Sequence, residues 1–282
     1  MADAPPGPGR RRGRRLAVGL AVAALVLLAA VGTYLVLLSR VSTGSVTVEE
    51  ARERAGTTGG EGDQGTVADV LRPAAGVYRY RGEGTERLDK PPTSQTQGPE
   101  IPGTLTHLEG GCWRLRVDYN TNHWQSWDYC PTDGGLVEVA GGFFQRLDLV
   151  VATVDTTSGY TCDPPVDAIR DTQQAGDEWP HECRGSSSGA EGEVVSSGPY
   201  TFVGPEVLEI GGTEVEALHY VRSRTLTGGQ DGTEEVETWF DAATGLPLRN
   251  ERDITVRSGS VVGSVTYEEQ GSFELESLTP AT

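Results

Sequence analysis

Hydrophobic and polar positions alternate along most of the chain after residue 72, which is the pattern of β-strands with one buried face. Pairs of glycines separate many of the alternating segments and indicate short turns. The predicted strands lie near residues 76–88, 103–109, 111–119, 123–130, 135–140, 143–153, 194–203, 206–210, 213–227, 233–240, 246–257 and 262–278. Strands that follow one another through short turns favour an antiparallel meander over a parallel sheet.

Several predicted strands carry polar residues on both faces. In the segment 246–256, for example, Asn250 and Arg252 share a face with Leu248 and Ile254. Such strands bury less apolar surface than the strands of a tightly packed sandwich. A strongly curved sheet with one face exposed to solvent accommodates them better. The expected fold class is therefore mainly β, a curved antiparallel meander resembling a half-barrel, over residues 73–280.

A different pattern precedes this domain. Residues 16–38 form a run of 23 residues without a charge, which as a helix spans about 35 Å and is long enough to cross a bilayer. The sequence predicts an uncleaved transmembrane signal-anchor helix here, with residues 39–72 as a juxtamembrane helix and linker. The short helix is expected at 46–55, ending at Gly56.

The charges beside the apolar run predict its orientation. Residues 1–15 contain five arginines, whereas Arg40 is the one basic residue close to the other end. Because positive flanks stay in the cytoplasm, we expect a cytoplasmic Arg-rich tail at 1–15 and an extracytoplasmic domain beyond the span. The predicted location is the cell membrane, with a single pass and the lipid bilayer as partner of the anchor helix.

The composition excludes one class of function. The chain has 23 basic and 41 acidic residues, and the part after residue 40 is more acidic than the whole. A nucleic-acid binder needs a basic face, so no nucleic-acid partner is expected. The same charge argues against electrostatic adhesion to an anionic lipid surface.

Four cysteines, all beyond the predicted span, favour two disulfides in an oxidising compartment. A hairpin centred on Thr121 places Cys112 opposite Cys130, so that these two are expected to pair. Cys162 and Cys183 then close an acidic, proline-containing loop. Metal ligation is the alternative for these cysteines, although their spacing lacks a C-x₂-C motif.

The register of this hairpin also predicts an apolar face. Trp113 and Leu115 lie on the same side as Trp127 and Tyr129, while Arg114 faces Asp128 on the other side. Together with Trp239, these four residues are candidates for the lining of a ligand groove. The alternative is that they form an ordinary hydrophobic core.

No catalytic or metal-binding motif stands out. The segment 185–189 matches G-x-S-x-G, but it lies in a predicted loop and lacks the strand-turn-helix that a nucleophile elbow requires. The four histidines form neither H-x-H nor H-E-x-x-H, and acidic residues in the predicted loop lack EF-hand spacing. We therefore expect a non-catalytic protein without a cofactor or a metal.

Longer segments suggest relatives. The anchor is followed by GVYRYRGEGTERLD (76–89), GCWRLRVDY (111–119), HWQSWDYC (123–130), TCDPP (161–165) and TWFDAATGLPLR (238–249). In this order the chain resembles a group of uncharacterised single-pass membrane proteins of actinobacteria. The last segment is also similar to a hairpin of LolA-like and mycobacterial lipoprotein carriers. That second resemblance implies a curved half-barrel holding lipid or acyl chains, although the chain has no lipobox cysteine and carries two expected disulfides.

These observations lead to two functional hypotheses. The first is a membrane-anchored, extracytoplasmic, non-catalytic domain that binds an apolar or lipid ligand of the cell envelope. The second is a structural or protein-interaction ectodomain that has no small-molecule ligand. The partner beyond the bilayer is accordingly an envelope lipid or a protein.

Overall fold

The computed structural model describes residues 25–29, 31–32, 43–57, 71–149, 152–260 and 263–281. The chain divides into two units, Met1–Arg40 and Val41–Thr282. In the first unit the described residues are helical. No helix within the described ranges is both long and apolar enough to cross a membrane. The predicted tail at 1–15 and most of the predicted span at 16–38 lie outside the described residues.

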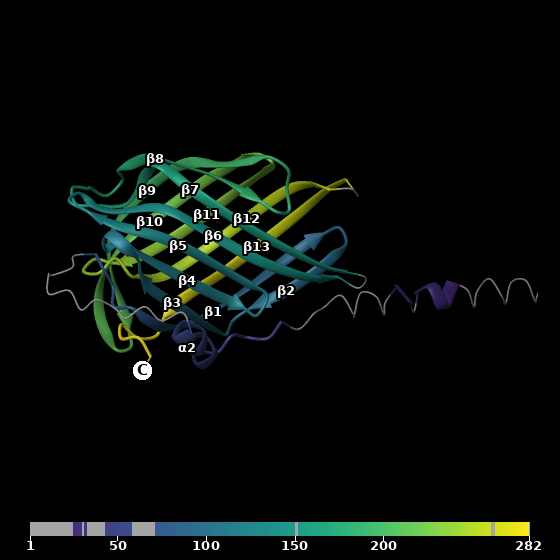
Figure 1. The fold of residues 1–282 in the computed structure, drawn as a ribbon, viewed down its shortest axis with the longest axis horizontal. Coiled ribbons are helices and arrows are strands. Elements are labelled where there is room, and N and C mark those ends of the chain that lie inside the picture. The colour runs from purple at the N-terminus through teal and green to yellow at the C-terminus, as the bar shows by residue number, and fades with distance from the viewer. Residues whose placement is uncertain are drawn as a thin grey trace, which may run out of the picture. The chain divides into compact units, whose positions relative to one another are not determined.

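The second unit is an antiparallel sheet in which each strand from β3 to β13 pairs with the next strand in sequence (Figure 1). Its described strands are β1 (Gly76–Asp89), β2 (Pro92–Gln97), β3 (Glu100–His107), β4 (Trp113–Asn120), β5 (His123–Thr132), β6 (Gly135–Leu149), β7 (Ala152–Arg170), β8 (Glu178–Ser187), β9 (Glu193–Ile210), β10 (Thr213–Gly228), β11 (Gln230–Asp241), β12 (Pro247–Ser260) and β13 (Gly263–Leu275). The predicted antiparallel meander is confirmed.

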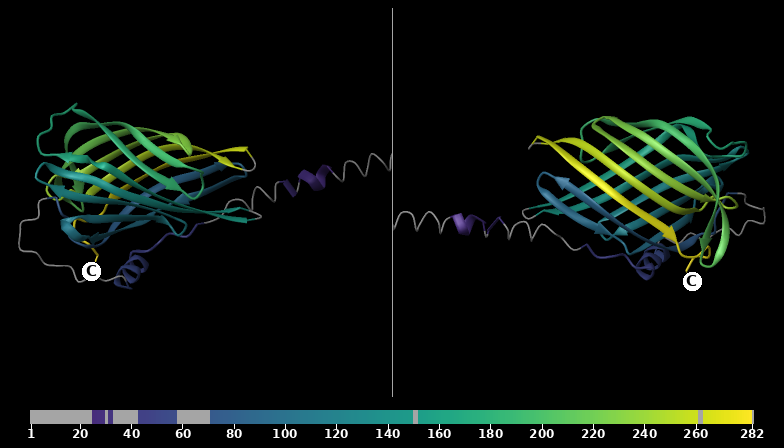
Figure 2. Two further views of the ribbon diagram at one scale, coloured as in Figure 1. Left: turned by 45° about the horizontal axis from the view of Figure 1, so that its top comes forward. Right: turned by 180° about the vertical axis from the view of Figure 1, so that it is seen from behind.

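The sheet closes into a barrel, which corrects the predicted half-barrel. β13 pairs with β1 from Leu275 opposite Tyr80 to Tyr267 opposite Leu88, and the two strands lie side by side in Figure 2. Closure removes the two edges of unpaired backbone groups that an open sheet would expose. The polar inward residues that suggested a wet face instead lie inside the barrel.

β2 and β3 act as one interrupted strand of this ring. Both pair with the same edge of β1, β2 beside its second half and β3 beside its first half. The interruption falls at Gly98, which has a φ of 74° and lies so close to the Gly82 carbonyl that a Cβ would be 1.9 Å from its oxygen. Only glycine fits there without moving the backbone.

Several strands are longer than predicted. β6 continues through Gly141 and Gly142, where the sequence predicted a turn. A Cβ on Gly141 would meet the Tyr160 hydroxyl at 2.3 Å, so this glycine serves a close packing contact. The predicted loop between Cys162 and Cys183 is also largely extended, because β7 continues to Arg170 and β8 begins at Glu178.

The predictions for the cysteines are confirmed. Disulfides join Cys112 to Cys130 and Cys162 to Cys183. In the first hairpin Trp113 pairs with Tyr129, and Arg114 donates two hydrogen bonds to the carboxylate of Asp128, as the register of the sequence predicts.

The short helix α2 (Val48–Thr57) lies two residues later than predicted. Thr47 caps it: its hydroxyl accepts the Glu50 amide hydrogen while the Glu50 carboxylate accepts that of Thr47. Val48 and Ala51 pack with Val77 of β1 in a small apolar cluster outside the barrel.

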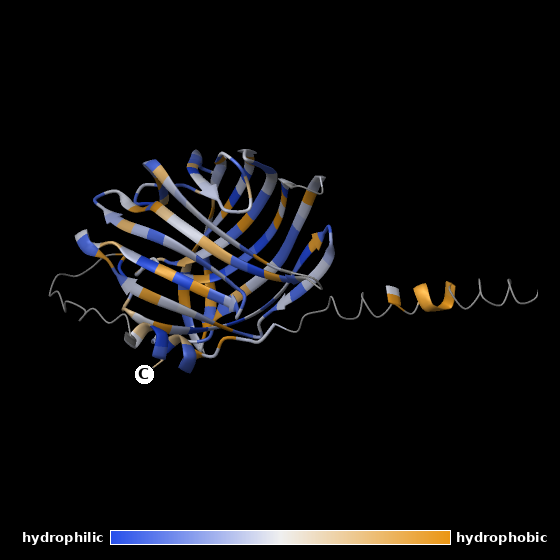
Figure 3. Cartoon of the chain, turned by 45° about the vertical axis from the view of Figure 1, so that its right-hand side comes forward, coloured by the Kyte–Doolittle hydropathy of each residue, from blue (hydrophilic) through white to orange (hydrophobic). Residues whose placement is uncertain are grey.

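The barrel interior is filled at one end. Hydrophobic and hydrophilic residues alternate along the strands (Figure 3), and the inward hydrophobic ones gather at the end where β4 begins. We call this packed region the aromatic plug. Its members include Tyr80, Trp113, Trp127, Tyr129, Phe240 and Phe273. Their rings contact one another edge-on or tilted, with centroids about 5–6 Å apart across Tyr80–Phe273 and Tyr129–Phe240.

The plug makes a stability prediction. Trp127 is 7% exposed, so Trp127→Ala should lower the free energy of unfolding by roughly 3–5 kcal/mol, measured by denaturant titration. Trp124→Ala is the matched control, because Trp124 is half-buried and stacks on Phe144. The control should lower the free energy of unfolding clearly less. Equal losses of free energy in the two variants would contradict the assignment of Trp127 to the plug.

Candidate functional site

The other end of the barrel contains a cavity of about 440 Å³, which we call the cup. Its volume falls within the range of about 300–1,000 Å³ that is usual for small-molecule pockets. The apolar lining includes Phe143, Leu147, Val154, Leu226, Ile254 and Val256. These six residues come from four strands, β6, β7, β10 and β12.

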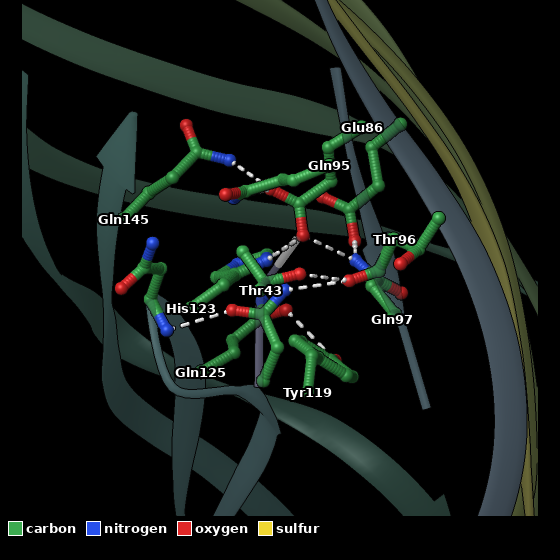
Figure 4. A network of polar contacts seen from close by, with 12 residues as sticks. Thr43, Glu86, Gln95, Thr96, Gln97, Tyr119, His123, Gln125 and Gln145 are labelled. Carbon is green, nitrogen blue, oxygen red and sulfur yellow. Dashed lines mark hydrogen bonds and ion pairs between the residues drawn. The ribbon is translucent and has the colours of Figure 1, made fainter. Parts of the chain in front are cut away.

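The inner end of the cup is polar and centres on the fully buried carboxylate of Glu86 (Figure 4). Four side chains bond to it within the described residues. Gln95 and Gln145 donate to Oε2 at 2.6 Å, and Gln97 donates to Oε1 at 2.8 Å. Nδ1 of His123 is also 2.8 Å from Oε1. A buried carboxylate with this many partners is held in a fixed position.

A second carboxylate, Glu269, adjoins the first. It accepts hydrogen bonds from Arg252 at 2.6 Å, from Gln97 at 2.8 Å and from Tyr267 at 2.8 Å. Burial opposes its ionisation, but the charges of Arg252 and His123 and the hydrogen bonds from Gln97 and Arg252 together outweigh burial, so that the pKa of Glu269 is lowered. Arg252 also lies 3.9 Å above the Tyr119 ring, which connects this polar layer to the plug.

His123 is the titratable group that joins this layer to the cup. Burial disfavours its imidazolium, yet the carboxylates of Glu86 and Glu269 outweigh burial, and the pKa of His123 is raised. The ring forms part of the cup's wall while Nδ1 is bonded to Glu86, which leaves Nε2 as the ring atom able to bond to a ligand. Protonated His123 and Arg252 together balance the two carboxylates.

Ligand atoms of Glu86, His123 and Glu269 lie within 4.8 Å of one another, close enough to surround a metal ion. The hydrogen bonds favour a different interpretation. Glu269 is already paired with the Arg252 cation, and three glutamine side chains direct N–H groups at the two carboxylates. The charges therefore compensate internally, and the layer offers hydrogen bonds to the cup.

A second buried polar group lies between the plug and β7–β8. Glu138 accepts a hydrogen bond of 2.6 Å from the Tyr160 hydroxyl and one of 3.3 Å from Arg222. His181 lies 3.5 Å from the same carboxylate, at the limit of a hydrogen bond. Burial dominates here, and the pKa of His181 is lowered.

The predicted groove residues lie elsewhere. Trp113 and Leu115 are fully buried in the plug, and Leu115, Trp127 and Tyr129 border a void of only about 20 Å³. Trp239 stacks on His219 with ring centroids 4.0 Å apart and donates a hydrogen bond to Glu206, which is 43% exposed. The cup is lined by a different set of residues.

The sequence contained part of the signal for the cup. The alternation in β12 put Ile254 on the same face as Arg252, and both face the interior. Likewise His123 shares a face with Trp127, as the predicted hairpin register requires. Alternation identifies the inward face, but not which part of that face is filled by partners from distant strands.

The fold and site define a closed antiparallel barrel with an apolar cup above a buried polar layer. No protein-family model matches the chain, and no curated protein matches it. Among solved structures, the chain is similar to the hypothetical lipoprotein YmcC from Escherichia coli K12, with 17% identity over 72% of this chain and 85% of that one. The TM-score is 0.32, so the neighbour does not inform the site.

The two buried histidines predict opposite pH dependences. Because the folded-state pKa of His123 is raised above its ordinary value of 6.5, its contribution is full below that pH and is lost as pH rises through the folded pKa. The stability difference between the native protein and His123→Gln should therefore shrink as pH rises above about 6.5, measured by denaturant titration.

His181→Gln is the matched comparison. Its folded pKa is lowered from 6.5, so the contribution of His181 is present above that pH and is lost as pH falls. The stability difference for this variant should grow between about pH 5 and 7. Parallel pH profiles for the two variants would contradict the assigned environments.

Proposed function

We propose that this protein is a membrane-anchored, extracytoplasmic, non-catalytic domain that binds an apolar molecule in the cup. The observation that carries the proposal is that side chains fill the barrel interior at one end and leave a cavity at the other. The same inward face that packs tightly in the plug leaves about 440 Å³ between apolar walls at the other end. An apolar cavity of this size gains free energy when an apolar ligand removes its walls from water.

The polar layer favours an amphipathic ligand. Its two carboxylates are balanced by Arg252 and by His123 when the latter is protonated, so the inner end of the cup suits a neutral polar group. Tyr267 and Gln145 bond to each other beside the cavity and offer further donors and acceptors. The ligand class supported best is therefore a lipid or similar molecule with an apolar body and a neutral hydrogen-bonding group.

Location forms a separate part of the proposal. Two disulfides stabilise a domain that works in an oxidising compartment. The uncharged segment 16–38 and the arginines before it support an anchor with the domain outside. An extracytoplasmic binding domain held at the membrane would draw its ligand from the cell envelope.

Filling the cup tests the binding proposal. Val256 lines the cavity, so the tryptophan of Val256→Trp should occupy part of the space. Binding of the neutral fluorescent probe N-phenyl-1-naphthylamine to residues 43–282 should therefore decrease. Thr255→Trp is the matched control. Thr255 precedes Val256 in β12, so its side chain points out of the barrel. This variant should bind the probe as the native protein does.

Loss of binding in the Val256 variant with unchanged thermal unfolding supports the cup. If the native domain binds no probe and releases no lipid in native mass spectrometry, the ectodomain without a small-molecule ligand is the better account.

A further inference from the structure

We propose that Nε2 of His123 holds the carbonyl group of a neutral, apolar ligand at the inner end of the cup, and that loss of the His123 proton weakens this hold. This inference rests on the proposed function. It adds the chemical group by which the ligand is recognised and the condition under which the ligand leaves.

The His123 ring is held in one orientation. Its Nδ1 atom lies 2.8 Å from Oε1 of the fully buried Glu86 (Figure 4). The Tyr119 ring packs against it with centroids 4.8 Å apart, and the Phe143 ring meets it edge-on at 6.4 Å. Because a carboxylate only accepts hydrogen bonds, Nδ1 carries a hydrogen in both charge states of the ring.

The second ring nitrogen therefore changes with the charge of His123. Nε2 has no hydrogen-bond partner among the described residues, and the ring lines the cup. When His123 is protonated, Nε2 directs an N–H group at the cup. When His123 is neutral, the same atom presents a lone pair.

Two amide side chains accompany His123 in the cup wall. Gln125 lies on the same face of β5, about 7 Å further along the strand, and Gln145 of β6 is paired with His123. Oε1 of Gln125 accepts a hydrogen bond from the Tyr119 hydroxyl at 3.3 Å, so its N–H groups remain for a ligand. The Nε2 of Gln145 is bonded within the polar layer, so its Oε1 remains as an acceptor. With His123 protonated, the wall offers two neighbouring donors and one acceptor.

This pattern suits a carbonyl oxygen. Its two lone pairs match the N–H groups of His123 and Gln125, and it brings no hydrogen that needs an acceptor of its own. A carboxylate has the same kind of oxygen but would add a third negative charge beside the buried Glu86 and Glu269, which is costly in the barrel interior. The group recognised is therefore a neutral carbonyl, as in an ester, an amide or a ketone.

The walls beyond the polar layer suit the rest of such a molecule. Ile254, Val256 and Val265 line the cup there. Val265 lies four positions from Glu269 along β13, which is about 13 Å. An alkyl chain of similar length would lie between these walls when its carbonyl group is at His123.

The surroundings of His123 make it the group that changes charge. Burial disfavours the imidazolium, but the carboxylates outweigh burial and the pKa of His123 is raised. Burial raises the pKa of Tyr119 and of Tyr267, whereas that of Glu269 is lowered, so these three groups keep their charge near neutral pH. The titratable and charged side chains that face the ring or the cup are Glu86 of β1, Tyr119 of β4, Glu234 of β11 with its partner Arg224 of β10, Arg252 of β12, and Tyr267 and Glu269 of β13.

Loss of the proton reverses the interaction at Nε2. The lone pair of neutral His123 then faces the lone pairs of the carbonyl oxygen, and the two repel each other. Binding of a carbonyl ligand should therefore be strongest below the folded pKa of His123 and should weaken as pH rises through it. A hydroxyl group can instead turn its hydrogen toward neutral Nε2.

A matched pair of ligands tests this subsite in residues 43–282, which form a compact unit with its own core and both disulfides. Methyl nonyl ketone and the secondary alcohol with the same carbon skeleton compete with N-phenyl-1-naphthylamine at about pH 5 and about pH 9. The affinity for the ketone should fall by about tenfold or more at the alkaline pH, since a hydrogen bond from a charged group is lost. The affinity for the alcohol should change by less than about threefold.

Two variants assign the effect to one histidine. In His123→Gln no titrating ring faces the carbonyl, so the pH dependence of ketone binding should disappear. His181→Gln is the matched control, because His181 is also buried but lies beside Glu138 and outside the cup lining. Infrared spectroscopy of the isotope-labelled ketone needs no variant: its carbonyl stretching frequency in the native complex should be lower at the acid pH, where the hydrogen bond is present.

Equal changes of affinity for the ketone and the alcohol, or a carbonyl frequency that does not respond to pH, overturn the role of His123. Tighter binding of decanoate than of methyl decanoate overturns the neutral carbonyl. If the native domain binds neither the probe nor any of these ligands at either pH, the proposed function fails. Probe binding without the expected pH dependence refutes the subsite alone.

Discussion

The pairing of β1 with β13 is the constraint on which the rest of the structure depends. Nine residue pairs along these strands join the beginning of the sheet to its end. Once the sheet is closed, every inward side chain shares one interior, and each polar group there needs a partner from another strand. Glu86 satisfies this requirement with partners from β2, β5 and β6, which closure brings to the same level.

The closed interior is divided by its buried charges. Aromatic side chains fill the side toward the start of β4, where Trp113 and its neighbours exclude space for a ligand. The layer of Glu86, Glu269 and Arg252 ends this packing, because charged groups are stable there only as a bonded set. Beyond the layer the described walls include apolar side chains again, and they enclose the cup instead of packing against one another.

This division relates stability to the proposed function. The plug and two disulfides stabilise the barrel without the cup being filled, so a ligand is free to enter and leave a preformed space. A preformed site avoids the cost of ordering the walls at each binding event.

The sequence by itself determined the antiparallel strands, the Cys112–Cys130 hairpin with its Arg114–Asp128 pair and the inward face of β12, because each depends on local alternation and turn chemistry. Only the tertiary structure decided that the sheet closes and that the hairpin's aromatic face is core, since both depend on strands far apart in the chain. The same applies to Gly141, whose glycine serves a contact with Tyr160 rather than a turn. Glu86 and His123 are 37 residues apart, and no local pattern relates them before the barrel closes.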